Sequence, residues 1–323
     1  MDTAWQYHRY GGVDVLAIGP LVRPRAGASE VIVRVHAAAL NPKDVLFRKG
    51  RFKPISGRRF PKFPGVDFAG VVVEAGPRAG LAVGARVFGA LQEWRFLRGS
   101  LASYLVARHD EVAPLADGLP FAQAAALPLA GLTALQALRD LGHVGAGARV
   151  AVNGGAGGVG SLAIQIARAR GAHVTAIASA RNRALCLELG ADEVLAYDEG
   201  DPLAGGSWDV FLDAFGNRSF PEVRSQLTPR GIYVSTVPSL RIVADRLRTA
   251  LVAKRARLVV VRASRPDLLE LVALWQSGKL RPLIDRVVPF GAVPEAFRHL
   301  ETKRARGKIV VEVAAGEDPT PRA

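Results

Sequence analysis

The first 120 or so residues contain short segments whose apolar and polar pattern is typical of strands. Residues 31–35 (VIVRV) alternate apolar and polar positions, and 68–73 and 84–89 are short apolar runs bounded by glycine or proline. Residues 51–65 (RFKPISGRRFPKFPG) are rich in proline, glycine and basic side chains, so they predict a loop. The N-terminal part is therefore expected to be a β-rich domain.

The pattern changes at Phe121. Residues 122–138 (AQAAALPLAGLTALQAL) are rich in alanine and leucine and predict a helix that Pro128 and Gly131 interrupt. Predicted strands then alternate with predicted helices. The strands are 149–152, 173–178, 193–195, 209–213 and 231–235, and the helices are 158–170 and 181–190. Such alternation is typical of a parallel, doubly wound Rossmann sheet, so the chain is predicted to be an α/β protein.

The C-terminal part returns to an extended pattern. A predicted helix at 266–277 leads to an extended stretch at 280–289 and to a strand at 307–313 (GKIVVEV). We therefore assign residues 1–118 and 281–323 to the β-rich domain and residues 119–280 to the Rossmann domain. The last ten residues are expected to fray.

Composition narrows the possible partners. The formal net charge is +14, from 43 Lys and Arg against 29 Asp and Glu, but the basic residues are scattered, and the densest group (241–262) is interleaved with apolar residues. We therefore expect an arginine-rich solvated surface and no specific nucleic-acid partner.

No apolar run reaches the ~18–20 residues of a membrane span. The single cysteine, Cys186, excludes an intrachain disulfide, and with no secretory pattern at the N-terminus it favours the cytoplasm.

A glycine-rich loop follows the first Rossmann strand. Residues 150–160 read VAVNGGAGGVG, which satisfies G-x-G-x-x-G between an apolar strand and a helix. In this motif Gly155 allows the tight turn, Gly157 lets the main chain approach a pyrophosphate, and Gly160 lets helix and strand pack closely. Helix N-termini present free N–H groups to phosphates. The predicted cofactor-binding residues are Gly155, Ala156, Gly157, Gly158, Val159 and Gly160.

The end of the second Rossmann strand predicts which dinucleotide binds. NAD enzymes usually carry an acid here that binds the ribose 2′-hydroxyl. This chain instead has Ser179, Arg181 and Arg183, a hydroxyl and two guanidinium groups that suit a 2′-phosphate. The alternative is that both arginines are ordinary exposed residues, although arginine at a helix start opposes the helix dipole. We predict NADPH as the cofactor.

Taken together, these residues resemble the quinone oxidoreductase branch of the medium-chain dehydrogenases/reductases, which includes zeta-crystallin-like proteins and enone reductases. The similar segments span nearly the whole chain: 38–50 (AALNPKDVLFRKG), 60–76, 127–138, 152–174, 189–198, 208–216 and 306–313. The resemblance implies a GroES-like catalytic domain around the Rossmann domain, with a cleft where NADPH meets an electrophilic small molecule. It also implies a homodimer formed through the nucleotide domain.

The resemblance separates the chain from the zinc alcohol dehydrogenases of the same superfamily. Where those enzymes carry Gly-His-Glu, this chain has Gly65, Val66 and Asp67, and its lone cysteine lies in the Rossmann half. The six histidines show no ligand spacing. No metal site is therefore expected. Without a Lewis acid, hydride transfer to a conjugated alkene or quinone is favoured over alcohol oxidation.

The resemblance also implies roles for single residues. Asn41 would point its amide at the nicotinamide ribose or substrate, although Asn-Pro-x-Asp is also a good helix start. Thr133 would face the nicotinamide and phosphate, unless it is a helix-interior threonine bonded to a carbonyl. Tyr197 would lie beside the 2′-phosphate, unless it is a half-buried aromatic. Lys308 would lie near the cleft, unless it is a surface lysine.

Two further features bear on the reaction. Thr236 and Val237, with Pro238, follow a strand whose end should border the cofactor, so their backbone is expected to hold the carboxamide. Many relatives carry Tyr or Lys just after Asn-Pro-x-Asp, where this chain has Leu46, Phe47 and Arg48. No general acid is therefore evident, and water is expected to supply the proton; Lys43, Arg51 and Lys53 are weak candidates for stabilising an enolate.

The sequence therefore predicts a zinc-independent, NADPH-dependent reductase of quinones or α,β-unsaturated carbonyls, with Asn41 as its catalytic residue. Two alternatives stay open. One is a non-catalytic NADPH-binding protein, either crystallin-like or RNA-binding. The other is a reductase of enoyl thioesters carried by a partner synthase.

Overall fold

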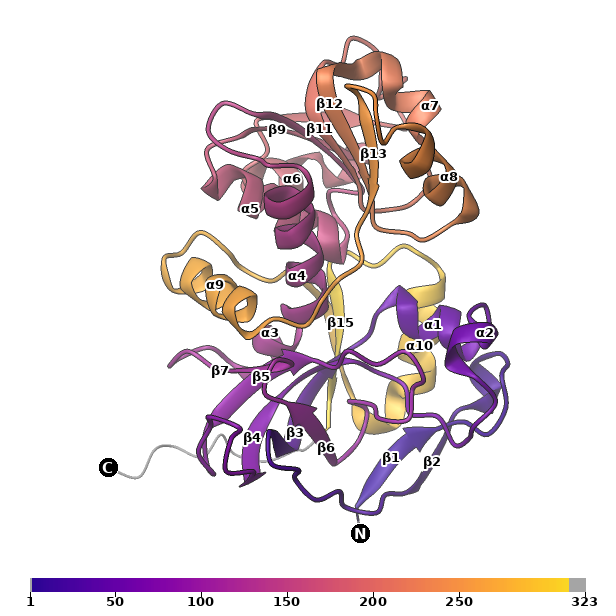
Figure 1. Cartoon of the computed structure of the whole chain (residues 1–323), viewed down its shortest axis with the longest axis vertical. Helices are drawn as coiled ribbons and strands as arrows, with labels where there is room; N and C mark the ends of the chain where they lie inside the picture. The colour runs from indigo at the N-terminus through magenta and orange to yellow at the C-terminus, as the bar shows by residue number, and fades with distance from the viewer. Residues whose placement is uncertain (1, 314–323) are drawn as a thin grey trace. The chain divides into compact units, whose positions relative to one another are not determined.

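The computed structural model describes residues 2–313, so the expected fraying of 314–323 lies outside the described residues (Figure 1). The chain forms two compact units. The first comprises the residues up to Leu129, Ala263–Leu269 and the residues from Ile284 onward, and the second comprises Ala130–Arg262 and Glu270–Leu283. The first unit is thus built from both ends of the chain.

The first unit contains a seven-stranded, mostly antiparallel sheet. Its longest strand, β3 (Glu30–Ala39), pairs with β4, β6 and β15, and its side chains are buried almost throughout. Gly70 of β4 lies opposite Val35, where a Cβ would stand 2.0 Å from the Arg34 carbonyl oxygen. The remaining strands are β4 (Asp67–Ala75), β5 (Arg86–Ala90), β6 (Tyr104–Arg108), β7 (Val112–Pro114), β14 (Ile284–Pro289) and β15 (Lys308–Glu312).

Smaller elements complete the first unit. A separate antiparallel pair joins β1 (Thr3–Gln6) to β2 (Ala17–Pro20), around the 3-10 turn Val13–Val15. The helices are α1 (Pro42–Arg48), α2 (Lys53–Ser56), α3 (Phe121–Ala125) and α10 (Val293–Glu301), which follows the 3-10 turn Phe290–Ala292. Helix α3 packs on β3 and β4, and α1 packs on α10. Their apolar faces enclose one core that includes Phe47, Phe68 and Phe297.

The second unit is a six-stranded parallel sheet of order β10-β9-β8-β11-β12-β13. This is the doubly wound Rossmann order, in which the strand order reverses beside the first strand. The strands are β8 (Arg149–Asn153), β9 (His173–Ala178), β10 (Glu193–Ala196), β11 (Trp208–Asp213), β12 (Leu227–Ser235) and β13 (Arg255–Leu258). The predicted fold class, a Rossmann sheet with a GroES-like domain, is confirmed.

The helices of the second unit connect these strands. They are α5 (Gly158–Ala169), α6 (Arg183–Glu188), α7 (Phe220–Val223) and α8 (Leu240–Arg248), with 3-10 turns at Ala180–Asn182 and Arg224–Gln226. Helix α4 (Pro128–Gln136) continues into a π-helical turn, Ala137–Leu141, and α9 (Arg265–Gln276) runs through the boundary between units. Within residues 2–313, every helix is too short or too polar to span a bilayer.

Several predicted boundaries differ from the structure. The expected interruption at Gly131 is wrong, because Gly131 lies inside α4; its missing side chain admits Leu271, which would be 2.6 Å from a Cβ there. The helix predicted over 181–190 begins as a 3-10 turn. The strand predicted at 84–89 is β5, shifted toward Ala90. Strands β1, β2, β6 and β7 were not predicted, since each is short and depends on non-local pairing.

Candidate active site

The glycine-rich loop joins β8 to α5 in the second unit. Gly154, with φ of 83°, takes the left-handed conformation in this turn, which the sequence motif does not assign to it. Gly155 packs instead against Ala176 and Cys186, 3.1 and 3.3 Å from its would-be Cβ. A Cβ on Gly160 would stand 2.1 Å from the Gly154 carbonyl oxygen, so only glycine allows the helix to approach the loop.

The same loop has the features of a phosphate cradle. Gly157 is the N-cap of α5, and the only atom near its would-be Cβ is the Gly154 oxygen at 3.3 Å, so the space above this main chain is open. The first N–H groups of the twelve-residue helix have no intrahelical partner and point out of its N-terminus. A pyrophosphate fits this arrangement, because the helix end offers both N–H donors and positive dipole charge.

The end of β9 offers two free donors. The Ser179 hydroxyl oxygen accepts a hydrogen bond from the Asn182 amide at 3.0 Å, so its own hydrogen remains available to donate. Arg181 is exposed and has no hydrogen bond or ion pair within residues 2–313. Arg183 differs, because its guanidinium donates to the Val194 carbonyl oxygen at 2.9 Å and to Glu199. Of the two predicted arginines, Arg181 is therefore the one poised to bind a new anion.

Acidic residues after β10 hold this corner together. The Asp198 carboxylate accepts the Ala180 N–H at 2.8 Å, and Glu199 pairs with Arg183. Tyr197, the residue that follows β10, is 58% exposed. The tyrosine is thus free to lie against an adenosine end, and the alternative of a half-buried aromatic does not describe it.

The strand ends at β11 and β12 are ordered by Asp213. This buried carboxylate accepts hydrogen bonds from the Asn153 amide (2.7 Å), the Tyr233 hydroxyl (3.0 Å) and the Gly216 N–H (2.8 Å). The Thr236 N–H donates to the Asp213 carbonyl oxygen, and the Val237 N–H donates to the Ser235 hydroxyl. Since both N–H groups are engaged, this segment would hold a carboxamide through carbonyl oxygens.

Thr133 lies inside α4 and is buried. This placement matches the alternative of a helix-interior threonine. It leaves the proposed contact of Thr133 with nicotinamide as a prediction.

A buried ionic cluster occupies the first unit around Asp67, the first residue of β4. Asp67 accepts hydrogen bonds from the Asn41 amide (2.9 Å), the Lys308 ammonium (2.9 Å) and the Leu129 N–H (2.7 Å). The Lys308 ammonium also donates to the Asn41 side-chain oxygen at 2.5 Å. Lys308 is 5% exposed, so the alternative of a surface lysine is excluded.

This cluster fixes what Asn41 can offer a ligand. Both amide hydrogens are used, since the second donation goes to the Ala39 carbonyl oxygen at 3.3 Å. Only one lone pair of the side-chain oxygen remains, because Lys308 occupies the other. Asn41 can therefore accept a hydrogen bond from a hydroxyl group, whereas donation through its amide would require this network to open.

Asp44, in the first turn of α1, is another buried carboxyl group of the first unit. One of its oxygens accepts the Asn41 N–H at 2.9 Å, as expected for the first turn of α1, and the other has no partner within the described residues. Burial, followed by the nearby Asp67 charge, raises the pKa of Asp44 to about 7. The two carboxylates therefore sit in opposite electrostatic surroundings.

The comparisons with known proteins agree with this architecture. The family described as "Alcohol dehydrogenase GroES-like domain" matches residues 27–117, and that described as "Zinc-binding dehydrogenase" matches residues 189–311. A mouse "NAD(P)H oxidoreductase RTN4IP1, mitochondrial" is 34% identical, over 96% of this chain and 89% of its own length. The chain belongs to the quinone oxidoreductase family of the medium-chain dehydrogenases/reductases.

Two further relatives lie in the same family. An Arabidopsis thaliana "NADPH-dependent alkenal/one oxidoreductase, chloroplastic" is 37% identical, over 95% of this chain and 78% of its own length. The structure of the quinone oxidoreductase from Coxiella burnetii matches with a TM-score of 0.90 at 32% identity, covering 97% of this chain and 99% of that one. This quinone oxidoreductase family member is accordingly an oxidoreductase that uses a nicotinamide cofactor.

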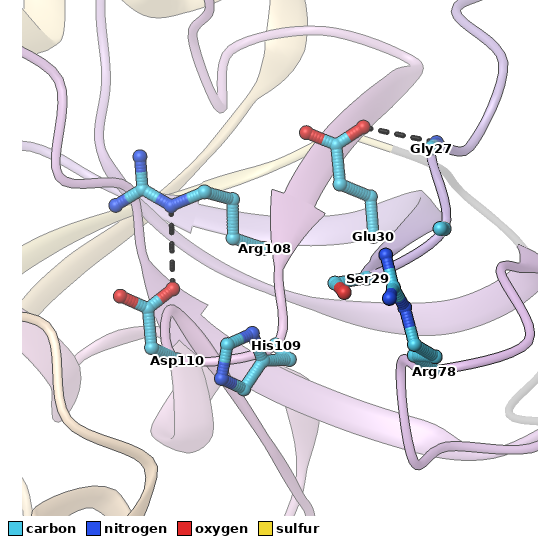
Figure 2. A pocket seen from close by; sticks show the side chains of 8 residues that line it. Gly27, Ser29, Glu30, Arg78, Arg108, His109 and Asp110 are labelled. Carbon is cyan, nitrogen blue, oxygen red and sulfur yellow. Dashed lines mark hydrogen bonds and ion pairs between the residues drawn. The ribbon is translucent and has the colours of Figure 1, made fainter.

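Potential metal ligands and surface hollows were the two other features that could mark a site among the described residues. Within residues 2–313, no group of three or more His, Cys, Asp or Glu side chains is placed to hold a metal ion. A hollow of about 470 Å³ in the first unit is lined by loop residues that include Glu30, Arg78, Arg108 and His109 (Figure 2). Arg108 is already paired with Asp110 there, and no predicted site residue lines the hollow.

Asp67 is not among the residues that the sequence predicts for the site, yet it organises Asn41 and Lys308. The signal in the sequence is a carboxylate inside an apolar run, VDFAGVVV, which cannot be buried without partners.

Proposed function

We propose that this protein is an NADPH-dependent reductase of quinones or α,β-unsaturated carbonyl compounds and that it transfers hydride without a metal ion. The relatives named as alkenal/one oxidoreductase and quinone oxidoreductase support the substrate class. The observation that carries the cofactor preference is the end of β9, where Ser179 and Arg181 offer free donors and no carboxylate occurs from Ala178 to Arg183.

In this proposal the residues of the chain bind the cofactor and orient it toward the substrate. The N-terminus of α5 holds the pyrophosphate, while Arg181 and the Ser179 hydroxyl hold the 2′-phosphate through charge-assisted hydrogen bonds. NADPH, when bound, supplies the hydride. Asn41 accepts a hydrogen bond from a hydroxyl of the cofactor or substrate, and the Lys308–Asp67 pair keeps its side chain in one orientation. A side chain locked in this way loses little entropy on binding.

Two arguments support metal-free transfer, one from the chemistry of the acceptor and one from the charge of the buried cluster. Addition of hydride to a conjugated alkene or quinone places negative charge on an enolate or hydroquinone oxygen, where it is delocalised, so less stabilisation is needed than for a simple carbonyl. Asp67 is neutralised by the Lys308 ammonium at 2.9 Å. A divalent cation at Asp67 would therefore meet a positive charge.

The cofactor preference is tested with Arg181→Glu. Losing a charge-assisted contact and adding a repulsive carboxylate should raise the KM for NADPH about 10- to 100-fold, since ~1.4 kcal/mol corresponds to tenfold. The KM for NADH should change little. The matched control is Arg230→Glu, which alters an exposed arginine of the same unit. Equal effects on NADPH and NADH would show that Arg181 does not read the 2′-phosphate.

The substrate class is tested by following NADPH oxidation with quinones, short enones and enoyl thioesters, with NADH as the comparison. Turnover of quinones or enones supports the proposal. Activity with enoyl thioesters alone would favour the synthase-linked reductase. NADPH binding without turnover of any electrophile would favour the alternative of a non-catalytic NADPH-binding protein.

A further inference from the structure

Alkene reduction needs a proton on carbon after the hydride has been delivered, and its donor is missing from the usual place. The positions just after Asn-Pro-Lys-Asp hold Leu46, Phe47 and Arg48. Phe47 is part of the core. The Arg48 guanidinium is fully buried and donates to the Gly11 carbonyl oxygen and to Glu301. None of these three side chains can deliver a proton.

Lys43 lies two residues after Asn41, in the first turn of α1, and its ammonium group is held among aromatic rings. The Nζ atom is 4.5 Å from the ring centroid of Trp94, 5.7 Å from that of Phe96 and 5.8 Å from that of Phe47. These distances fall within the ~6 Å range of cation–π attraction. Aromatic faces position the ammonium but accept none of its three hydrogens through a conventional hydrogen bond.

Among the described residues of the first unit, Lys43 differs from every other buried or half-buried cation. Each of the others donates to a carboxylate, an amide or a carbonyl oxygen, namely Arg48, Lys62, Arg86, Arg98, Arg108, Arg265 and Lys308. Lys43 has neither a hydrogen bond nor an ion pair within residues 2–313. Its N–H groups are therefore available to a ligand.

The surroundings of Lys43 favour loss of its proton. Burial lowers the pKa of Lys43, against the opposing influence of Asp44, Glu93 and Asp67. An ammonium with a lowered pKa is a stronger acid near neutral pH, and general acids work best when their pKa lies near the working pH.

We propose that Lys43 is the general acid that protonates the α-carbon in alkene reduction. The proposal rests on the reductase function above. Hydride from NADPH forms the C–H bond at the β-carbon, and the alkene electron pair moves to form the enolate. The enolate then takes a proton from the Lys43 ammonium: one N–H bond breaks, the α-carbon C–H bond forms, and a neutral amine remains until solvent protonates it. The sum consumes one NADPH and one proton and gives NADP⁺ and the saturated carbonyl compound.

A comparison of enones with quinones distinguishes proton donation by Lys43 from simple charge stabilisation. An enone needs a proton on carbon, which water delivers slowly, whereas a hydroquinone needs one only on oxygen, which water delivers readily. Lys43→Met should lower kcat for an enone about 100-fold or more, the usual contribution of a general acid. It should change kcat for a quinone less than about tenfold, since quinone reduction does not use this step.

Lys43→Arg and a matched control sharpen the test. Arginine keeps the positive charge but does not release a proton near neutral pH, so Lys43→Arg should be as impaired on enones as Lys43→Met. Methionine suits the aromatic surroundings, so folding should be preserved, which NADPH affinity and thermal unfolding verify. Lys279→Met removes an exposed lysine of the second unit and should behave like the wild type.

The position of deuterium in the product provides a readout that a structural role would not change. In D₂O the wild type should place deuterium on one face of the α-carbon, and Lys43→Met should give both faces. The alkaline limb of the wild-type enone kcat profile should fall below the ordinary lysine pKa of about 10.4 and be absent in Lys43→Met.

Each outcome decides the proposal. Restored enone activity in Lys43→Arg, or an equal loss on quinones and enones, overturns it. An unimpaired Lys43→Met enzyme also overturns the role of Lys43 but leaves the proposed reductase function intact. A wild type that reduces quinones but not enones has the same consequence. A wild type that binds NADPH but reduces neither class overturns both proposals.

Discussion

At the scale of single residues, two buried carboxyl groups of the first unit differ in their supply of hydrogen bonds. Asp67 receives three hydrogen bonds, one of them from the Lys308 ammonium. Asp44 receives one hydrogen bond, and burial raises its pKa to about 7. A buried carboxyl group with few hydrogen-bond donors holds its proton more tightly, because the charged form is poorly solvated.

Asp44 gives a prediction for stability against pH. Its folded pKa of about 7 exceeds the ordinary aspartate value of 3.8, so the folded state binds the proton more tightly than the unfolded state does. The free energy of unfolding should therefore fall as pH rises from about 4 to about 7, and this contribution should be constant above that window. Asp44→Asn keeps a side-chain acceptor for the Asn41 N–H but cannot ionise.

The measurement is chemical unfolding of the wild type and Asp44→Asn across this pH range. The difference in stability between them should shift in favour of Asp44→Asn as pH rises. Glu312→Gln, which changes an exposed carboxylate, should track the wild type. A difference that is constant with pH would mean that Asp44 is ionised throughout.

At the scale of elements, the β8–α5 connection depends on three glycines for three different reasons. Gly154 supplies the left-handed turn, Gly160 the close approach of α5 to the loop, and Gly157 the open space above the helix N-terminus. The sequence motif predicts the loop but not which glycine has which of these roles. The 2.1 Å distance between an added Gly160 Cβ and the Gly154 carbonyl oxygen, for example, arises only once strand and helix have packed.

Alanine substitutions should separate packing from ligand binding in this loop. Gly160→Ala forces a methyl group against the backbone of Gly154 and should cost about 1–3 kcal/mol of stability, as overpacking does. Gly157→Ala meets only the Gly154 carbonyl oxygen, at 3.3 Å, so it should lower the Tm less than Gly160→Ala does and weaken NADPH binding, because its methyl group stands where the pyrophosphate approaches. Thermal unfolding and NADPH titration measure both. A Gly157→Ala protein with full affinity would place the phosphates elsewhere.

At the scale of the whole molecule, we propose that side-chain charge takes the place of a catalytic metal ion. The Gly-Val-Asp segment carries no histidine, and the Asp67 carboxylate is matched by a lysine from the far end of the sequence. Chains of this family share the zinc enzymes' architecture, so the difference lies in a few side chains rather than in the fold.

Removal of metals tests this replacement. Extended dialysis against a strong chelator should leave NADPH-dependent activity on quinones or enones unchanged, and metal analysis of the active protein should find far less than one zinc per chain. A zinc alcohol dehydrogenase treated in parallel should lose activity, which verifies the chelation. Activity that disappears on dialysis and returns with zinc would contradict metal-free transfer.

The sequence by itself determined the features that depend on local spacing. Apolar periodicity and the strand–loop–helix context of the glycines predicted the Rossmann sheet, and Asn41 with Pro42 predicted the start of α1. The absence of an acid after β9 predicts NADPH rather than NADH, and this preference stays a prediction.

Tertiary structure alone decided which side chains meet across long separations. Lys308 joins Asn41 and Asp67 only because β15 pairs with β3, and β3 in turn pairs with β4. Packing between separate segments likewise produces the ion pair between Arg183 and Glu199 and the aromatic surroundings of Lys43. Burial and hydrogen-bond supply set the charge of each group, and neither quantity can be read from spacing along the chain.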